Sequence, residues 1–328
     1  MAKPKVAVLI REPLRRRILS DDDLAKLEEV AEVELSPHGR DMTEDEVAAM
    51  LRTADGCMSS WGTPPLTSRI VDSAPGLKIW AHAAGSVKPM VADDAWYGGV
   101  TVTSAAPAIA ADVAEMTMAC ITMGLRCVVP LSRRMAANQP VDRDSVRSLY
   151  RATVGVISAS HVGRRVVERL LPYEARILLY DPFVDDDEAA RMGVELADLD
   201  EMARECDAVT CHAPKLPETY HMVGESHFTA MRDDTVFVNT SRGDNVDEAA
   251  LIRELQKGRL FAFLDVTSPE PAAPDSPLRT LPNVVLTPHI AGAKSFRTGA
   301  MAVEELCRFF QGQPQIHQVT RDMLPVIA

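Results

Sequence analysis

Three side chains in the last third of the chain have the types needed to interconvert a carbonyl and a hydroxyl group. Arg242 lies in NTSRGDNVD, Glu270 in LDVTSPEP and His289 in LTPHIAG. A planar guanidinium suits a carboxylate and can polarise a neighbouring carbonyl. An imidazole beside a carboxylate retains a proton near neutral pH and can give it to an alkoxide. These three are the candidate catalytic residues, the alternatives being a surface arginine, a rim glutamate and a core histidine; the sequence does not show that they touch.

The stretch 154–181 has the layout of a dinucleotide-binding βαβ unit. An apolar run at 154–157 precedes a small-residue turn, a helical pattern ending at Pro172, a second apolar run at 177–180, and Asp181. The Asp181 carboxylate can accept hydrogen bonds from the ribose hydroxyls of NAD and repel the 2′-phosphate of NADP. A plain βαβ unit without a nucleotide remains the alternative.

The turn in this unit departs from the G-x-G-x-x-G pattern, because it reads Ser158-x-Ser160-x-x-Gly163. Gly163 retains the role of close helix–strand packing. Each serine adds a Cβ, so we expect φ to be negative at both positions, since a positive φ would cost about 1 kcal/mol. The serine hydroxyls could instead donate to a phosphate and compensate for the lost glycines.

Alternating strand and helix patterns predict an α/β protein of two doubly wound parallel-sheet domains. Residues 133–150 are polar and predict an irregular surface connection. The expected strands are 5–10, 32–35, 56–58, 77–80, 154–157, 177–180, 208–211, 235–239, 261–264 and 284–286, and the expected helices are 21–30, 43–51, 107–125, 228–231 and 248–256.

Polar residues follow several of these strands. Asp181, His212, the 239–242 segment, Asp265 and His289 each stand at or just past a strand's carboxyl end. In an open parallel sheet ligands bind beyond that end, so we expect these residues to converge on one crevice.

Composition limits the classes of function. The 328-residue chain has a net charge of −12, which argues against nucleic acid or an anionic membrane surface as a partner. Six cysteines occur without a C-x-x-C pair, as expected for reduced thiols in the cytoplasm. We find no run of roughly 18 apolar residues, no signal peptide and no metal-binding pattern, so we expect no membrane association and no metal.

The chain resembles the D-isomer-specific 2-hydroxyacid dehydrogenases. The resemblance is carried by VGVISASHVGR with YDP, CHAPKLPETYHMV, FVNTSRGDNVDEAAL, LDVTSPEP and LTPHIAG, in the family's order and spacing. It implies that Arg242 orients a 2-oxo acid, that His289 is the general acid/base and that Glu270 is its partner. It also implies cofactor contacts from Ser158, Ser160, His161, Val162, Gly163, Asp181, His212, Ala213, Pro214, Thr219, Thr240, Ser241, Asp265 and Gly292, and substrate contacts from Ala84, Gly85, Ser86, Lys88, Arg242 and His289.

The resemblance further implies a discontinuous architecture. Residues 1–103 and 290–328 would form a substrate domain, and residues 104–289 a Rossmann-like NAD-binding domain, with a cleft between them. The 107–125 helix would support a homodimer. The implied activity is interconversion of a small 2-oxo acid and its D-2-hydroxy acid, with NADH preferred over NADPH.

Two departures from the family pattern leave alternatives open. Lys88 follows the substrate loop where small and acidic residues are more usual, so it is either a second anion contact or an exposed loop lysine. Ser158 and Ser160 leave open a dehydrogenase silenced by an impaired pyrophosphate turn. An NAD(H)-sensing binding protein, similar in fold to the carboxyl-terminal-binding corepressors, is the third reading.

Overall fold

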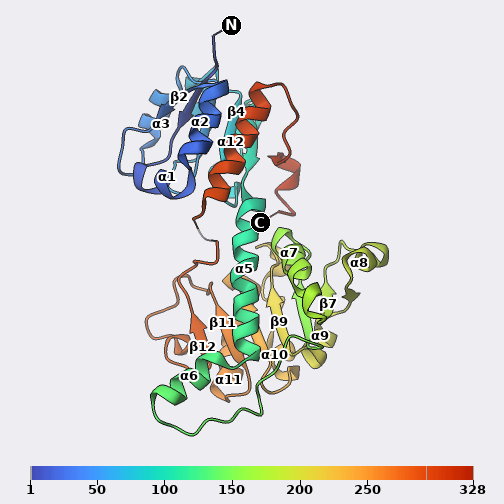
Figure 1. The fold of residues 1–328 in the computed structure, drawn as a ribbon. Helices are drawn as coiled ribbons and strands as arrows, with labels where there is room; N and C mark the ends of the chain where they lie inside the picture. The colour runs from blue at the N-terminus through green and yellow to red at the C-terminus, as the bar shows by residue number, and fades with distance from the viewer. Residues whose placement is uncertain (1, 293, 328) are drawn as a thin grey trace. The chain divides into compact units, whose positions relative to one another are not determined.

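The computed structural model describes residues 2–292 and 294–327. The chain forms two compact units: unit 1 combines Met1–Ile109 with Ala293–Ala328, and unit 2 is Ala110–Gly292. Unit 1 therefore contains both ends of the printed chain, and unit 2 is inserted within it (Figure 1).

Unit 1 is built on a sheet of six strands within the described ranges, in the order β13-β5-β4-β3-β1-β2. Strands β1 to β5 are parallel to one another, and β13 pairs antiparallel with β5. The blue and red segments of Figure 1 lie side by side here, because α12 packs against α1 and α2. The elements are β1 (Lys5–Val8), α1 (Glu12–Ile18), α2 (Asp21–Val30), β2 (Glu32–Leu35), α3 (Glu44–Leu51), β3 (Gly56–Ser59), α4 (Ser68–Ser73), β4 (Ile79–His82), β5 (Thr101–Ser104), α12 (Phe296–Phe310) and β13 (Gln318–Val319), with short 3-10 helices at Lys88–Met90, Ala95–Tyr97 and Arg321–Met323.

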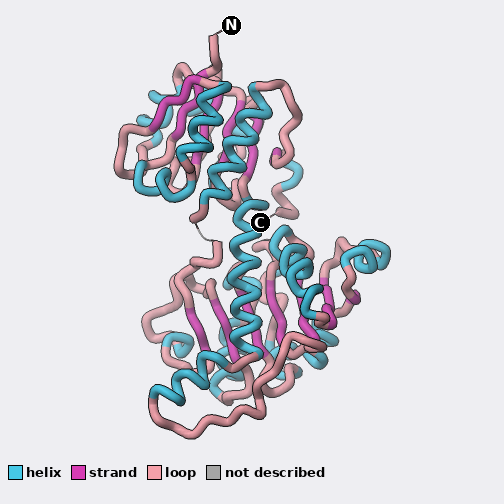
Figure 2. The backbone as a smooth tube through the Cα atoms, viewed as in Figure 1, coloured by secondary structure: helices cyan, strands magenta, loops and turns pink. Residues whose placement is uncertain are grey.

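Unit 2 is built on a sheet of seven strands among the described residues, all parallel, in the order β12-β11-β10-β9-β6-β7-β8. The order reverses at β6, which lies between β7 and β9, as in dinucleotide-binding folds. Figure 2 shows the strands of each unit gathered in one layer bordered by helices. The elements are α5 (Ala106–Leu125, which begins in unit 1), α6 (Val128–Ala136), β6 (Thr153–Ile157), α7 (His161–Leu170), β7 (Arg176–Tyr180), α8 (Asp186–Met192), β8 (Glu195–Leu196), α9 (Leu199–Glu205), β9 (Ala208–Cys211), α10 (Glu225–Ala230), β10 (Val236–Asn239), α11 (Glu248–Gln256), β11 (Phe261–Leu264) and β12 (Val284–Leu286), with 3-10 helices at Leu171–Tyr173, Pro217–Thr219, Gly243–Asn245 and Pro277–Arg279.

Local sequence explains several boundaries. Ser20 caps α2 by accepting from the Asp23 N–H, and Thr43 and Glu46 form the capping box expected at the start of α3. In α5, Gly124 lies so close to the sheet that a Cβ there would be 2.5 Å from Val236. Small residues therefore allow this helix to pack closely on β10.

The α5 helix also corrects the expectation about apolar runs. Its 20 residues are long and apolar enough to cross a membrane by length and composition, and 56% of the apolar window is buried in the structure. Burial of this kind is typical of the core helix of a globular unit.

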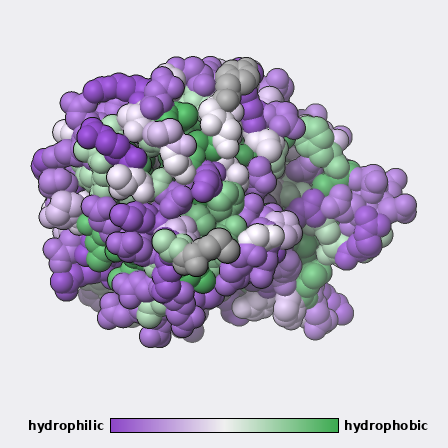
Figure 3. Space-filling view, turned by 90° about the horizontal axis from the view of Figure 1, so that it is seen from above, coloured by the Kyte–Doolittle hydropathy of each residue, from purple (hydrophilic) through white to green (hydrophobic). Residues whose placement is uncertain are grey.

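The face drawn in Figure 3 is mostly hydrophilic, with hydrophobic groups in small separate areas.

Some expected elements differ in extent. The 133–150 connection is not wholly irregular, because 133–136 form the end of α6. The strand expected at 77–80 is shifted to Ile79–His82, because the 77–78 segment only links the turn at 75–76 to the strand. The strand expected at 5–10 ends at Val8.

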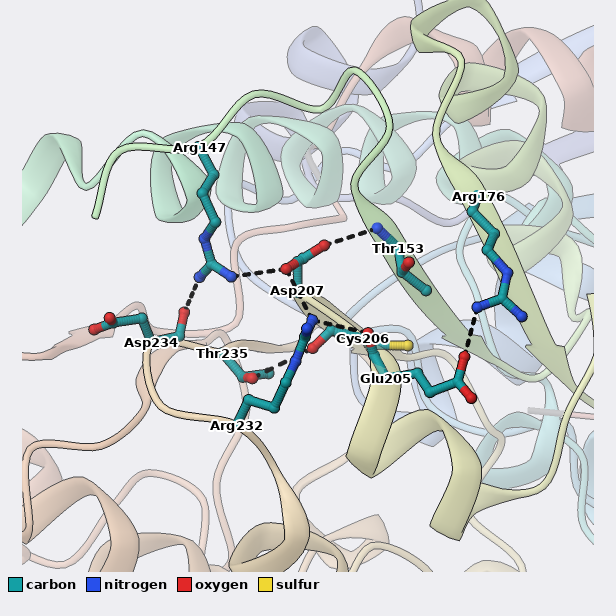
Figure 4. A network of polar contacts seen from close by, with 9 residues as sticks. All are labelled: Arg147, Thr153, Arg176, Glu205, Cys206, Asp207, Arg232, Asp234 and Thr235. Atoms are coloured by element: carbon teal, nitrogen blue, oxygen red, sulfur yellow. Dashed lines mark hydrogen bonds and ion pairs between the residues drawn. The ribbon is translucent and has the colours of Figure 1, made fainter. Parts of the chain in front are cut away.

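A polar network ties together the amino-terminal ends of the unit 2 strands (Figure 4). Asp207, just before β9, accepts hydrogen bonds from the Thr153 N–H at 2.8 Å, Arg147 at 2.8 Å and Arg232 at 2.9 Å. Arg147 also donates to the carbonyl of Asp234. The network secures the 143–150 segment on the side of the sheet opposite the strands' carboxyl ends.

Candidate functional site

The structure brings His289 and Glu270 into direct contact. Nδ1 of His289 lies 2.6 Å from Oε1 of Glu270, and about half of each side chain is exposed. Because Glu270 engages Nδ1, the Nε2 atom is the one left to exchange a proton with a ligand. The pair therefore has the arrangement of a general acid/base and its orienting carboxylate.

Asp265 holds the segment that carries His289. Its buried carboxylate accepts from the backbone N–H groups of Ile290 and Ala291, both at 2.8 Å, and from the Thr287 hydroxyl at 2.6 Å. The His289 N–H donates to the Asp265 carbonyl at 2.9 Å, and His289 itself has φ +53°. The cofactor contact implied for Asp265 stays a prediction, and its carboxylate fixes the loop that carries His289.

Arg242 lies in the loop after β10, just before the 3-10 helix Gly243–Asn245. Its Nη1 donates to the Ser241 carbonyl at 2.7 Å, and the Asn239 side chain donates to the Arg242 carbonyl at 2.9 Å. Burial lowers the pKa of the Arg242 guanidinium, and the nearby Glu270 carboxylate partly opposes this. Arg242, Glu270 and His289 thus come from the carboxyl ends of three adjacent strands, β10, β11 and β12.

The turn between β6 and α7 corrects one expectation. Ser158 has φ +78°, in the region that glycine prefers, whereas Ser160 has φ −60°. Ser160 caps α7, accepting from the Gly163 N–H at 3.4 Å, and its hydroxyl donates to the His212 carbonyl at 2.9 Å. A Cβ on Gly163 would lie 1.9 Å from the Ser158 carbonyl oxygen. The backbone therefore has the shape of a glycine-rich turn despite the serines.

This turn and its surroundings fit a dinucleotide. The amino-terminal end of α7, which includes His161 and Val162, lies at the strand-order reversal, where the first N–H groups of a helix can bind phosphate. Asp181 accepts from the Ala159 N–H at 2.7 Å, the Phe183 N–H at 2.9 Å and the Ser158 hydroxyl at 3.3 Å. A carboxylate has about four acceptor positions, so Asp181 can still accept from a ribose hydroxyl.

His212 provides a further sign of fit. It is 4% exposed, its Nε2 lies 3.0 Å from the Thr210 hydroxyl, and its Nδ1 is buried without a partner among the described residues. Burial lowers the pKa of His212 to about 3, so the imidazole is neutral. An orphaned polar atom beside the β6–α7 turn is consistent with a site that a ligand completes.

The other predicted cofactor residues differ in what their side chains do. Thr240 pairs with Thr117 at 2.9 Å, and the Ser241 hydroxyl donates to Asn239 at 2.8 Å, so both are used inside unit 2. Thr219 donates to the Pro214 carbonyl at 2.6 Å and shapes the loop after β9. Ala213 is buried in this loop, and Gly292 is the last residue of unit 2.

The predicted substrate loop lies in unit 1. Ala84, Gly85 and Ser86 follow β4, and the Gly85 carbonyl accepts from the Ser104 hydroxyl at 2.6 Å. The half-buried Lys88 begins a 3-10 helix, and its N–H donates to the Ser86 hydroxyl at 3.3 Å. Neither reading of the Lys88 side chain is tested by these contacts.

Asp244 and Ser268 were not identified from the sequence. Both lie within the quoted segments NTSRGDNVD and LDVTSPEP, and their side chains bond to each other between the Arg242 and Glu270 loops. The signal that could have identified them is their position, since Asp244 lies two residues after Arg242 and Ser268 two residues before Glu270. No group of three or more metal-ligating side chains occurs in the part of the chain that the structure describes.

Comparisons with known proteins show the family of this chain. Residues 118–291 match the model of the D-isomer specific 2-hydroxyacid dehydrogenase NAD binding domain. The chain is 31% identical to a glyoxylate reductase of Korarchaeum cryptofilum, over 99% of this chain and 98% of the relative. It is also 31% identical to a D-3-phosphoglycerate dehydrogenase of Methanocaldococcus jannaschii, over 98% of this chain but only 60% of that longer relative.

Solved structures support the same fold. A structure of the TT0316 protein from Thermus thermophilus is similar with a TM-score of 0.76 and 27% identity, covering 96% of this chain and 100% of that one. The apo D-mandelate dehydrogenase of Rhodotorula graminis has a TM-score of 0.80 at 23% identity, covering 99% of each chain, which shows likeness of fold. By its matched domain and its full-length relative, the chain belongs to the D-isomer-specific 2-hydroxyacid dehydrogenase family.

Proposed function

We propose that this protein is an NADH-dependent reductase of a small 2-oxo acid, able to run in either direction by mass action. The observation that carries the proposal is the 2.6 Å contact between His289 and Glu270 beside Arg242. When bound, NADH supplies the hydride that adds to the keto carbon. His289 donates a proton from Nε2 to the oxygen, Glu270 orients the ring through Nδ1, and the Arg242 guanidinium binds the acid.

The preference for NADH over NADPH is supported by Asp181. Its carboxylate lies at the end of β7 and is held toward the β6–α7 turn by the Ala159 N–H. A 2′-phosphate beside this negative charge would be repelled, whereas ribose hydroxyls can donate to it. The amino-terminal turn of α7 would hold the pyrophosphate.

Glyoxylate or hydroxypyruvate is our first choice of substrate. The full-length relative is named a glyoxylate reductase, and other relatives are named D-3-phosphoglycerate dehydrogenases. We propose that Ala84, Gly85 and Ser86 hold the substrate carboxylate through backbone N–H groups. If Lys88 is a second anion contact, a more acidic substrate would be favoured over glyoxylate.

A cytoplasmic homodimer is our proposal for the assembly. On α6, Val128 and Met135 are exposed hydrophobic residues. A second copy covering these groups would remove them from water. All six cysteines are free thiols, in keeping with a reducing compartment.

The test is NADH consumption with a panel of 2-oxo acids, run beside His289→Gln. We expect turnover on at least one small acid and a loss of 10²- to 10⁴-fold in the variant, the range for removing a general acid. His317→Gln, a histidine of unit 1 near β13, is the matched control and should retain activity.

Other outcomes separate the remaining hypotheses. Full activity in His289→Gln would contradict the assigned acid. NADH binding without turnover on any acid would favour a binding protein. Failure to bind NADH, restored by replacing Ser158 and Ser160 with glycine, would indicate a silenced dehydrogenase.

A further inference from the structure

Asp244 joins three loops at the carboxyl ends of adjacent strands. Its Oδ2 pairs with Nζ of Lys215, which lies in the loop after β9. Its Oδ1 accepts a hydrogen bond from the hydroxyl of Ser268, which lies in the loop after β11. We call the side chains of Lys215, Asp244 and Ser268 the Asp244 latch.

The charge state of Asp244 defines the direction of these bonds. Hydrogen bonds from Lys215 and Ser268 lower the pKa of Asp244, so its side chain is a carboxylate and only accepts. The Ser268 hydroxyl is therefore the donor, and a bond to a charged acceptor is roughly twice as strong as a neutral one.

Two further contacts fasten the same loops. The Ser268 N–H donates to Oε2 of Glu248 at 2.9 Å. A Cβ on Gly243 would lie 2.1 Å from the Thr267 carbonyl group, so the loops after β10 and β11 are in close backbone contact. Glu248 is half-buried, and this burial raises its pKa.

The latch lies two residues from each of two candidate catalytic groups. Asp244 follows Arg242, and Ser268 precedes Glu270. Asp265 secures the His289 segment independently, through the Ile290 and Ala291 N–H groups. The loop that carries Glu270 is therefore held separately, through the hydrogen bond from Ser268 to Asp244.

We propose that Asp244 and Ser268 are positioning residues that hold Glu270 against His289 and keep its loop in register with Arg242. The expected effect on turnover rests on the proposed function. The expected effect on the Glu270–His289 contact does not, because the contact exists without substrate.

The experiment compares Ser268→Ala with Ser276→Ala. Both changes delete one hydroxyl from the segment after β11, but the Ser276 hydroxyl is buried without a partner among the described residues. The first readout is the ¹⁵N shifts of the His289 imidazole in the protein without ligands, assigned with His289→Gln. The second readout is kcat, together with KM for NADH and KM for the 2-oxo acid that the protein reduces.

We expect Ser268→Ala to move the His289 ¹⁵N shifts and to lower kcat about 10-fold, with KM for NADH within 2-fold. A 10-fold loss corresponds to about 1.4 kcal/mol, which is the size of effect expected when one hydrogen bond to a charged group is lost. Ser268→Thr, which restores a hydroxyl, should recover most of both effects, and Ser276→Ala should change neither. Asp244→Asn, which can still accept from Ser268 but loses its charge, should be intermediate.

Unchanged His289 shifts and unchanged kcat in Ser268→Ala would overturn the proposal. So would equal effects in Ser268→Ala and Ser276→Ala, since a general loosening of the loop would then explain both. If the shifts move in Ser268→Ala but the unmodified protein reduces no acid, the positioning role stands and the proposed function fails.

Discussion

Ser158 occupies a backbone conformation that its side chain disfavours. Its φ is +78°, and the strain of this conformation is only partly offset by the hydrogen bond from its hydroxyl to Asp181. At 3.3 Å this bond is too long to be a strong one. The sign of this φ could not be predicted from the sequence. A serine in place of glycine predicts a negative φ, but the turn kept the positive φ that a glycine would adopt there. Contact between Glu270 and His289 was likewise beyond the sequence, since their spacing does not determine how two loops meet.

Replacing Ser158 with glycine should therefore stabilise unit 2. We expect Ser158→Gly to raise the free energy of unfolding by up to about 1 kcal/mol, because glycine adopts positive φ without strain. Thermal unfolding with and without NADH measures the effect and reports any change in cofactor binding.

The matched change at the other serine should have the opposite sign. Ser160 has negative φ and caps α7, so Ser160→Ala should cost about 1 kcal/mol. Destabilisation by Ser158→Gly would show that the Asp181 bond outweighs the strain.

At the scale of elements, the unit 2 strands were the most predictable part. The strands at 208–211, 261–264 and 284–286 were predicted to the residue, because buried parallel strands are short, apolar and bounded by turn residues. The short helices α8 and α9 were not predicted, although Asp185 and Asp198 cap them. The two-residue strand β13 has no local signal, because its pairing with β5 is set by tertiary contact.

The Asp207 network should contribute more to unit 2 than a surface ion pair does. The Asp207 side chain is 18% exposed and accepts from a backbone N–H and two arginines. We expect Asp207→Ala to lower the free energy of unfolding by about 2 kcal/mol, because it leaves the part-buried Thr153 N–H and two partly exposed arginines without this acceptor. Chemical denaturation of the variant gives the value.

Asp233→Ala is the comparison for this prediction. Asp233 pairs with Arg259 at 2.7 Å but is 76% exposed, so its loss should cost less than about 1 kcal/mol. Equal losses in the two variants would show that Asp207 is no more than a surface partner.

At the scale of the whole molecule, the described residues of each unit include one buried neutral histidine, His82 in unit 1 and His212 in unit 2. Burial lowers the pKa of His82 in unit 1 to about 4 and that of His212 in unit 2 to about 3. The unfolded chain takes up a proton at each site below its ordinary pKa of about 6.5, whereas the folded units do not. The free energy of unfolding therefore keeps its full value, as far as these histidines are concerned, above pH 6.5. It decreases as the pH falls toward 4 for His82 and toward 3 for His212.

Acidification from pH 7 to 5 should thus lower the unfolding free energy of each unit by about 2 kcal/mol through these histidines. Thermal unfolding of the unmodified protein, His82→Gln and His212→Gln across that pH range measures how much of the loss each histidine causes. The variants should show a shallower loss with falling pH, and an unchanged slope would contradict the assignment of the proton uptake to these residues.

The insertion of unit 2 within unit 1 has a consequence for biosynthesis. In unit 1, Ala302, Val303 and Leu306 of α12 pack into the same core as Leu14 and Ile18, so an earlier segment of this unit is completed only after unit 2 has been made. At about 5–20 residues per second, residues 110–292 take roughly 10–40 s to emerge, and unit 2 can fold during that time. Until α12 has been made, the apolar residues of unit 1 that pack against it stay exposed to water, and exposed apolar surface of this kind promotes aggregation during folding.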